Sequence, residues 1–268
     1  QSMQNNAMKD LTVNTATAAH GMYYCKDVNS VVSLDGSPAL ALRAGKMFGF
    51  RQTMLGREAA PIGEIPVKDM TASLLKVLEE AAKLAPEQKY VRGAFSGGTY
   101  MDEAANALTE LIGPVYSNCP LRPEWRLENS YVSKENTLID YGEEEFTLGR
   151  PHPAIDPSIR RPAILREAAD PETAVILLDF ILTPPGHPDP TGYVLEDIAM
   201  ARMMARAEGR ELIFIASVLG TSADFQDLAK QKRQLEEAGV IVCQTNYRAA
   251  VLAGEIIRQK READRNGH

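Results

Sequence analysis

Residues 174–182, AVILLDFIL, form a nearly continuous apolar run that is broken by one acidic residue, Asp179. A strand with one face in water alternates apolar and polar residues, whereas an unbroken run indicates a strand buried on both faces. A second run of this kind, LIFIASVL, occupies residues 212–219. The two runs predict central strands of a parallel sheet that is covered by helices on both faces.

Strand and helix patterns alternate on both sides of these runs. Alternation of this length implies right-handed crossovers and a parallel sheet, so we expect an α/β, flavodoxin-like, doubly wound sheet of five strands with order 2-1-3-4-5. A short strand at 146–148, paired with 138–141 as a hairpin, is also predicted. The predicted strands are 90–95, 138–141, 174–182, 212–219 and 240–245, and the helices are 99–112, 159–168, 191–208, 222–238 and 247–259.

The first 88 residues have a less regular pattern. Gln1-Ser2-Met3 resembles the remnant of a cleaved tag and is set aside. Ser37-Pro38 predicts a helix N-terminus, and residues 71–85 place apolar side chains on one helical face. We expect a mainly helical N-terminal extension over residues 4–88. The flavodoxin-like domain then spans 89–260, and a frayed tail spans 261–268.

Composition and charge exclude several classes of protein. The 268-residue chain is 44% hydrophobic and carries a net charge of −7, which opposes general affinity for nucleic acid or anionic membranes. No apolar run approaches the roughly 20 residues of a membrane span, and no secretory signal is visible. Three cysteines without a CxxC pair form neither a disulfide framework nor a cysteine-rich zinc site. We expect a cytoplasmic protein without a metal site.

The loop after the first predicted strand is the first candidate site. In the predicted order, ligands bind outside the carboxyl ends of the first and third strands, where the topology switches. Ser96-Gly97-Gly98-Thr99 lies there and opens a helix. Uncovered N–H groups, two hydroxyls and the helix dipole predict a phosphate or carboxylate site. The alternative is an ordinary turn with Thr99 as the helix cap.

Two proline-rich segments present histidines, namely GRPHPAIDP at 149–157 and PPGHPDP at 184–190. The prolines stiffen the backbone around His152 and His187. A histidine at the switch point can bind an anion, act as a general acid or base, or accept a phosphoryl group. The alternatives are a structural His152 that is bonded to a carbonyl group and a His187 in a surface loop.

Four further residues complete the predicted anion site. Arg150 offers a planar guanidinium to phosphate or carboxylate. Gly186 lies beside His187, and Gly220 and Thr221 follow the fourth strand, where helix capping is the alternative role. Asp156 and Asp189, each before a proline, are predicted helix caps.

The sequence lacks the residues that other functions of this fold require. A phosphoacceptor receiver domain needs acidic residues at the ends of the first and third strands, where Phe95-Ser96 and Thr183-Pro184 stand. Asp179 lies inside its strand. A flavin site needs a longer phosphate loop and aromatic residues around the ring, and neither a Walker loop nor a GxGxxG fingerprint is present.

Three motifs, in this order and spacing, resemble the carboxyl-terminal half of the FdrA family. They are FSGGT at 95–99, LIDYG at 138–142 running into FTLGRPHPAIDP at 146–157, and GHPDP at 186–190. FdrA proteins are relatives of succinyl-CoA synthetase in the ADP-forming acyl-CoA ligase superfamily. The resemblance covers roughly residues 89–257 and implies a CoA-ligase domain. In succinyl-CoA synthetase, helix starts of two such domains hold a phosphohistidine, and Ser96–Thr99 match one such start.

The resemblance also implies partners. No Rossmann-type CoA-binding domain precedes residue 89, an ATP-grasp domain does not fit, and the Gly-His-Ala-Gly phosphohistidine loop is missing. We therefore expect one domain or subunit of an acyl-CoA synthetase-like enzyme, with no tightly bound cofactor, that receives CoA and ATP or ADP through partner domains. The sequence is also compatible with assembly as a homo-oligomer.

Two alternatives use the same fold. The first is a subunit of a carbamoyltransferase, similar to oxamate carbamoyltransferase, that handles carbamoyl phosphate at the same anion site. The second is a non-catalytic assembly module whose loops only dock partner chains.

Overall fold

The computed structural model describes residues 4–6, 9–12, 22–25, 30–33 and 76–266, and the chain divides into two units, residues 1–75 and 76–268. In the first unit, β1 (Gln4–Asn6) pairs antiparallel with β2 (Lys9–Thr12), and β3 (Met22–Cys25) pairs antiparallel with β4 (Ser30–Ser33).

These described residues differ from the helical extension expected from the sequence. Aromatic and β-branched residues in β3 and β4 favour extended backbone, and this local preference was overlooked. The helix predicted from Ser37 lies outside the described residues. Residues 76–81 are helical, which agrees with part of the helix predicted over 71–85.

The second unit contains the predicted five-stranded sheet. All strand pairs are parallel and the order is β6-β5-β7-β8-β9, which confirms the predicted 2-1-3-4-5 topology. The strands are β5 (Tyr90–Phe95), β6 (Thr137–Asp140), β7 (Thr173–Ile181), β8 (Ile213–Leu219) and β9 (Ile241–Cys243).

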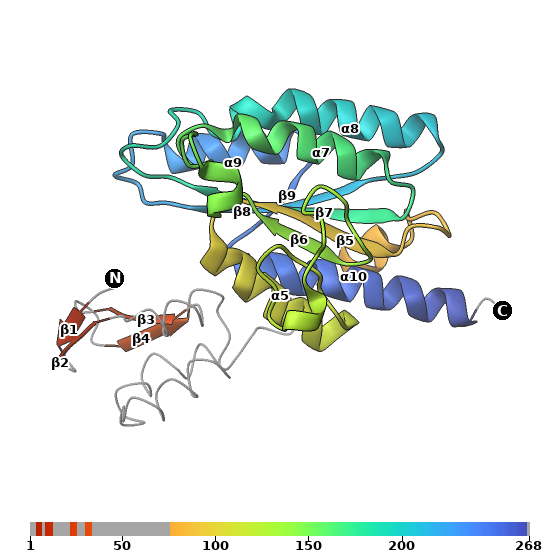
Figure 1. The fold of residues 1–268 in the computed structure, drawn as a ribbon, viewed down its shortest axis with the longest axis horizontal. Helices are drawn as coiled ribbons and strands as arrows, with labels where there is room; N and C mark the ends of the chain where they lie inside the picture. The colour runs from red at the N-terminus through yellow and green to blue at the C-terminus, as the bar shows by residue number, and fades with distance from the viewer. Residues whose placement is uncertain (1–3, 7–8, 13–21, 26–29, 34–75, 267–268) are drawn as a thin grey trace. The chain divides into compact units, whose positions relative to one another are not determined.

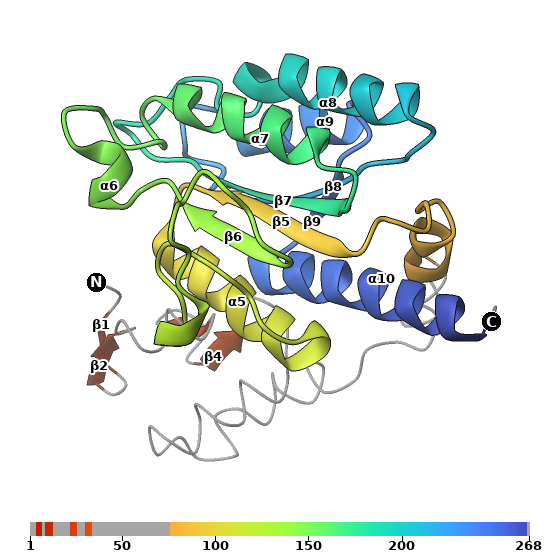
Figure 2. The same cartoon turned by 45° about the vertical axis from the view of Figure 1, so that its right-hand side comes forward.

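Helices cover both faces of this sheet. Helices α5 and α10 lie on one face, and α7, α8 and α9 lie on the other (Figures 1 and 2). Each face has its own apolar core, and the central strand β7 contributes side chains to both. The helices are α5 (Gly98–Ile112), α6 (Glu144–Thr147), α7 (Arg160–Ala169), α8 (Leu195–Ala207), α9 (Leu228–Glu237) and α10 (Asn246–Asn266).

Several boundaries differ from the predictions. The segment predicted as a hairpin strand at 146–148 belongs largely to helix α6, and among the described strands β6 pairs with β5 alone, with one further bridge from Thr137 to Tyr116. Residues 222–227 form turns before α9 begins, because Asp227 caps that helix by accepting a hydrogen bond from the Lys230 N–H. Helix α10 continues to residue 266, through most of the tail that was expected to fray.

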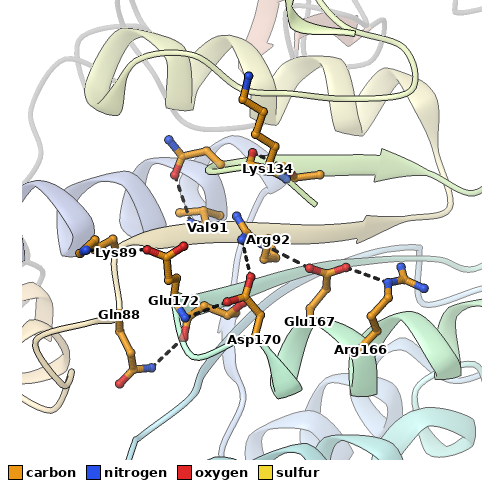
Figure 3. Close-up of polar contacts among 12 residues, drawn as sticks. Gln88, Lys89, Val91, Arg92, Lys134, Arg166, Glu167, Asp170 and Glu172 are labelled. Atoms are coloured by element: carbon orange, nitrogen blue, oxygen red, sulfur yellow. Dashed lines mark hydrogen bonds and ion pairs between the residues drawn. The ribbon is translucent and has the colours of Figure 1, made fainter. Parts of the chain in front are cut away.

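The amino ends of the strands hold a buried ionic cluster (Figure 3). Arg92 of β5 is buried, and its Nη2 lies 2.7 Å from Asp170 Oδ2 while its Nε lies 3.3 Å from Glu167 Oε2. Glu167 also pairs with Arg166, whose guanidinium donates to the Tyr141 hydroxyl. This cluster ties α7 to β5 at the end of the sheet opposite the predicted site.

Candidate functional site

The start of α5 lies at the topological switch point, as predicted. Its N-cap is Gly97, which has no side-chain cap, whereas Thr99 lies inside the first turn; the prediction of a Thr99 cap was therefore wrong. Helix α5 begins directly after the short turn that follows β5. Because Gly97 and Gly98 have no side chains, side chains from β6 and β7 approach their backbone closely.

A carboxylate of the chain itself binds part of this helix start. Asp179 accepts hydrogen bonds from the Ser96 N–H at 2.7 Å, the Ser96 hydroxyl at 3.0 Å and the Gly97 N–H at 2.9 Å. Asp179 belongs to β7 and is buried. The amides of Ser96 and Gly97, predicted to bind a ligand anion, are thus satisfied by an internal one.

A buried arginine neutralises Asp179. Arg160, at the start of α7, lies with its Nη2 3.4 Å from Asp179 Oδ1 and stacks over the Phe180 ring at 5.0 Å. Its Nε and Nη2 have no hydrogen-bond partner among the described residues. Burial lowers the pKa of Arg160, while the Asp179 carboxylate opposes that shift.

The next two N–H groups of the helix start remain free for a ligand. The N–H groups of Gly98 and Thr99 have no partner among the described residues, as is usual for the first turn of a helix. Thr99 is exposed and Gly98 is half-buried. Within the predicted SGGT loop, Gly98 and Thr99 are therefore the accessible residues whose N–H groups have no partner among the described residues.

A second carboxylate, Asp140, borders this free part. It is the last residue of β6, opposite Phe95 in the strand register, and it is buried. Its Oδ1 accepts the Gly142 N–H at 2.8 Å, and the Asn118 side chain bonds both its backbone N–H and its carbonyl group. Burial, together with the charges of Glu143, Asp179 and Asp102, raises the pKa of Asp140 to about 6, although the Gly142 hydrogen bond acts in the opposite direction.

His152 reaches the same corner of the sheet. A Cβ built on Gly142 would lie 2.7 Å from His152 Nε2, 3.0 Å from Asp140 Oδ1 and 3.0 Å from the Ser96 carbonyl oxygen. The His152 Nδ1 accepts the Ala154 N–H at 3.2 Å, so the neutral ring carries its proton on Nε2. The predicted bond of a structural His152 to a carbonyl group is absent from the described hydrogen bonds.

His187 lies in the next loop and contacts the His152 loop through the backbone. Its N–H donates to the Ala154 carbonyl at 2.9 Å, and its Nδ1 accepts the Asp189 N–H at 3.0 Å. Its half-buried ring packs edge-on against Tyr193 at 4.9 Å. The 149–157 and 183–190 loops are therefore joined, and the first of them borders the turn that precedes α5.

The other predicted residues divide between the site and its support. Arg150 is exposed and lies near enough to Asp156 to lower the pKa of that carboxyl, although hydrogen bonds from Ser158 lower it more. Gly186 packs against the Ala154 carbonyl. The N–H and hydroxyl groups of Thr221 both donate to Asp224, and Gly220 packs on Leu182, so this loop binds its own carboxylate instead of offering donors.

The two Asp-Pro predictions had different outcomes. Asp156 caps the short 3₁₀ turn Pro157–Ile159 by accepting the Ser158 N–H at 3.0 Å, as predicted. Asp189 does not cap a helix, because its carboxylate accepts from the Gln231 side chain at 2.9 Å and pairs with Lys230. It fastens the His187 loop to α9.

Sequence reasoning missed three important residues, Asp140, Asp179 and Arg160. Asp179 was set aside because it lies inside its strand, yet it is only two residues from the end of β7 and its side chain reaches the loop after β5. The one polar residue within an otherwise apolar strand was the available indication, since a buried carboxylate requires a partner.

Neither a metal cluster nor a membrane-crossing helix is found in the part of the chain that the structure describes. No group of three or more His, Cys, Asp or Glu side chains there is placed to hold a metal ion. No described helix combines the length and the apolar character of a membrane span.

Comparison with known proteins identifies the family. The model of the CoA-ligase family matches residues 94–256, which include the whole site described above. This chain belongs to the CoA-ligase family. It is also 45% identical over 187 residues to the uncharacterized protein YahF of Escherichia coli (strain K12). That match covers 70% of this chain and 36% of YahF, so the chain spans about a third of the length of that relative.

This chain is similar to parts of two proteins of solved structure. One is PH0766 from Pyrococcus horikoshii OT3, which is 11% identical to this chain with a TM-score of 0.39. The match covers 69% of this chain and 40% of the PH0766 chain. The dinucleotide-forming acetyl-coenzyme A synthetase 1 of Ca. Korarchaeum cryptofilum, solved with phosphate and ADP, is 14% identical. Its TM-score is 0.47, over 86% of this chain and 46% of its own.

Proposed function

We propose that this chain is the CoA-ligase domain of an FdrA-type, acyl-CoA synthetase-like enzyme and that it binds a phosphorylated or carboxylated intermediate at the start of α5. The observation that carries the proposal is the free N–H pair of Gly98 and Thr99 at the switch point. A helix N-terminus with free N–H groups favours a phosphate or carboxylate.

The surrounding loops supply the remaining chemistry. Phosphoryl and acyl transfer depend on donors placed where negative charge develops. The Gly98 and Thr99 amides would hold the anion, the Nε2–H of His152 would donate from the Gly142 side, and Arg150 would add positive charge. His187 would act from the adjoining loop, as a donor or as the residue that accepts the phosphoryl group.

The complete activity requires partner domains. We propose that CoA and the nucleotide bind to a separate domain or subunit, because the described residues form a single CoA-ligase domain and an N-terminal unit of short hairpins. Co-purification with a chain that carries CoA-binding and ATP-grasp domains is the expected result. Isolation of the active complex without any such domain would contradict this part of the proposal.

Calorimetric titration of the full chain with inorganic phosphate and acetyl phosphate tests the site directly. We expect Arg150→Gln to weaken phosphate binding about tenfold, as loss of one charge-assisted contact implies. Arg258→Gln is the matched control, because Arg258 lies on the exposed surface of α10 and its ion pairs within the described part of the chain are with Glu255 and Glu262. Equal affinity in both variants would place the anion elsewhere.

Carbamoyl phosphate and CoA belong in the same titration series. No contact of the described residues favours the carbamoyltransferase or the assembly-module alternative. Tight binding of carbamoyl phosphate alone would nevertheless favour the first. Unchanged activity of the assembled complex after His152→Ala and His187→Ala would favour the second.

A further inference from the structure

One oxygen of Asp140 points at the free end of α5 without a partner. A Cβ built on Gly98 would lie 2.6 Å from Asp140 Oδ2, so this oxygen packs against Gly98 in the first turn of the helix. Whereas Oδ1 accepts the Gly142 N–H, Oδ2 accepts no hydrogen bond from any residue that the structure describes. Asp140 is only 3% exposed.

The groups that face Asp140 from the surrounding elements are mostly acidic. Asp179 differs from the other acidic groups, because the charge of its carboxylate is neutralised by Arg160. No arginine or lysine forms an ion pair with Asp140 among the described residues. The facing titratable groups are Glu143 after β6, Asp102 on α5, Asp179 on β7, Cys119 in the loop after α5 and His152 in the 149–157 loop.

An oxyanion at Gly98 and Thr99 would therefore meet Asp140 Oδ2. An ionised Asp140 would repel the oxyanion, because the two negative charges would be close together at a half-buried site where water screens them poorly. A protonated Asp140 would instead donate a short hydrogen bond from its O–H to the oxyanion. The two protonation states of this one side chain have opposite effects on the ligand.

We infer that Asp140 couples anion binding at the α5 start to the uptake of one proton, so that the site takes an oxyanion together with the proton that Asp140 shares with it. This inference rests on the proposed anion site. It assigns Asp140 a role in ligand specificity, because the site then favours ligands that arrive with a proton or at low pH. Burial and the acidic neighbours, which raise the pKa of Asp140 to about 6, place the transition in an accessible range.

Sulfate is the suitable probe, because it carries no titrating proton between pH 5.5 and 7.5. Titration of the full chain should give a sulfate Kd that rises more than tenfold over this interval, since one linked proton changes affinity up to about tenfold per pH unit above the pKa. Asp140→Asn should bind sulfate with less than threefold change over the same interval. Its amide can still accept from Gly142 and donate to the anion.

Two further variants separate Asp140 from its neighbours. His152→Gln should bind sulfate more weakly yet keep the pH dependence, and Asp102→Asn should keep both affinity and pH dependence within about threefold. A flat profile in His152→Gln together with an unchanged slope in Asp140→Asn would put the proton on His152 and overturn the inference. Absence of sulfate and phosphate binding in every variant at every pH would overturn the proposed anion site itself.

Carboxyl ¹³C NMR supplies a readout that does not depend on the affinity of the variants. By reciprocity, saturating sulfate should raise the pKa of Asp140 in the wild-type chain. An Asp140 titration that sulfate leaves unchanged, with sulfate shown to be bound, would overturn the inference while the anion site stands.

Discussion

The two ends of the same sheet hold buried charge in different ways. At the amino ends, the Arg92 guanidinium meets two carboxylates, those of Glu167 and Asp170 (Figure 3). At the carboxyl ends, Asp179 of β7 is paired with Arg160 and accepts three hydrogen bonds. Asp140 lies on β6, on the other side of β5, and forms no ion pair with a cation among the described residues.

The difference separates structural charge from charge that is available to a ligand. A buried charge that is neutralised by an opposite charge joins two elements of the fold and has little affinity left for a ligand. A buried carboxyl group with a free oxygen, a raised pKa and a free helix start in front of it is a candidate for chemistry. The following variants test that distinction, in order of the expected effect.

Asp179→Ala should cause the largest loss of stability. The substitution removes the ion-pair partner of buried Arg160 and leaves the N–H groups of Ser96 and Gly97 without their acceptor. Loss of one partner of a buried ion pair costs about 3–5 kcal/mol. Urea denaturation at pH 7 gives the free energy of unfolding. Adding Arg160→Met should recover part of the loss, because the unpaired buried charge is then gone; no recovery would show that the Arg160 charge is already satisfied by water.

Glu167→Ala should be the next largest change, at the amino ends. Arg92 retains Asp170, so we expect a loss of about 3 kcal/mol, at the lower end of the range for a broken buried pair. Glu172→Ala is the matched control at the same end, because the Lys89–Glu172 pair is about half exposed at 3.7 Å and should contribute less than about 1 kcal/mol. Similar losses in both variants would contradict the structural role of the Arg92 cluster.

Asp140→Asn should have a smaller effect, of opposite sign. The pKa of Asp140 is raised from 3.8 to about 6 in the folded chain, so ionisation of this group destabilises the fold as the pH rises through that interval. The variant should therefore be more stable than the wild type by about 1–2 kcal/mol at pH 8, after allowance for solvent screening, and nearly equal to it at pH 4. Thermal melts at the two pH values measure this, and a variant that is less stable at pH 8 would show that the ionised carboxylate stabilises the fold.

Much of the sheet was predictable, because its strands are continuous apolar runs. The order of the strands and most helix positions followed from the regular alternation of elements. The 146–148 segment was wrong because three apolar or β-favouring residues cannot distinguish a strand from one turn of helix, and Glu143–Glu145 start a helix there. The helical periodicity likewise did not show that residues 222–227 form turns and that the helix predicted over 222–238 begins only at Leu228.

The candidate site was predictable in its place and less so in its residues. The motifs that contain Gly98, Thr99, His152 and His187 do lie at or beside the switch point. The internal bonds of Asp179 to Ser96 and Gly97 could not be predicted, because the two segments are more than 80 residues apart. The bonds from Thr221 to Asp224 are local in sequence, but they depend on the geometry of a turn that the residue pattern did not specify.

The sequence by itself determined the class of fold, since apolar periodicity and the spacing of turns act locally and dictate parallel strands with helical crossovers. Tertiary structure alone decided which N–H groups of the α5 start are free. That outcome depends on two side chains brought in from neighbouring strands, Asp179 that binds the first amides and Asp140 that covers the next. Hydrogen bonds and charges act over a few ångströms in space, whatever the distance along the chain, and only the folded sheet sets those distances.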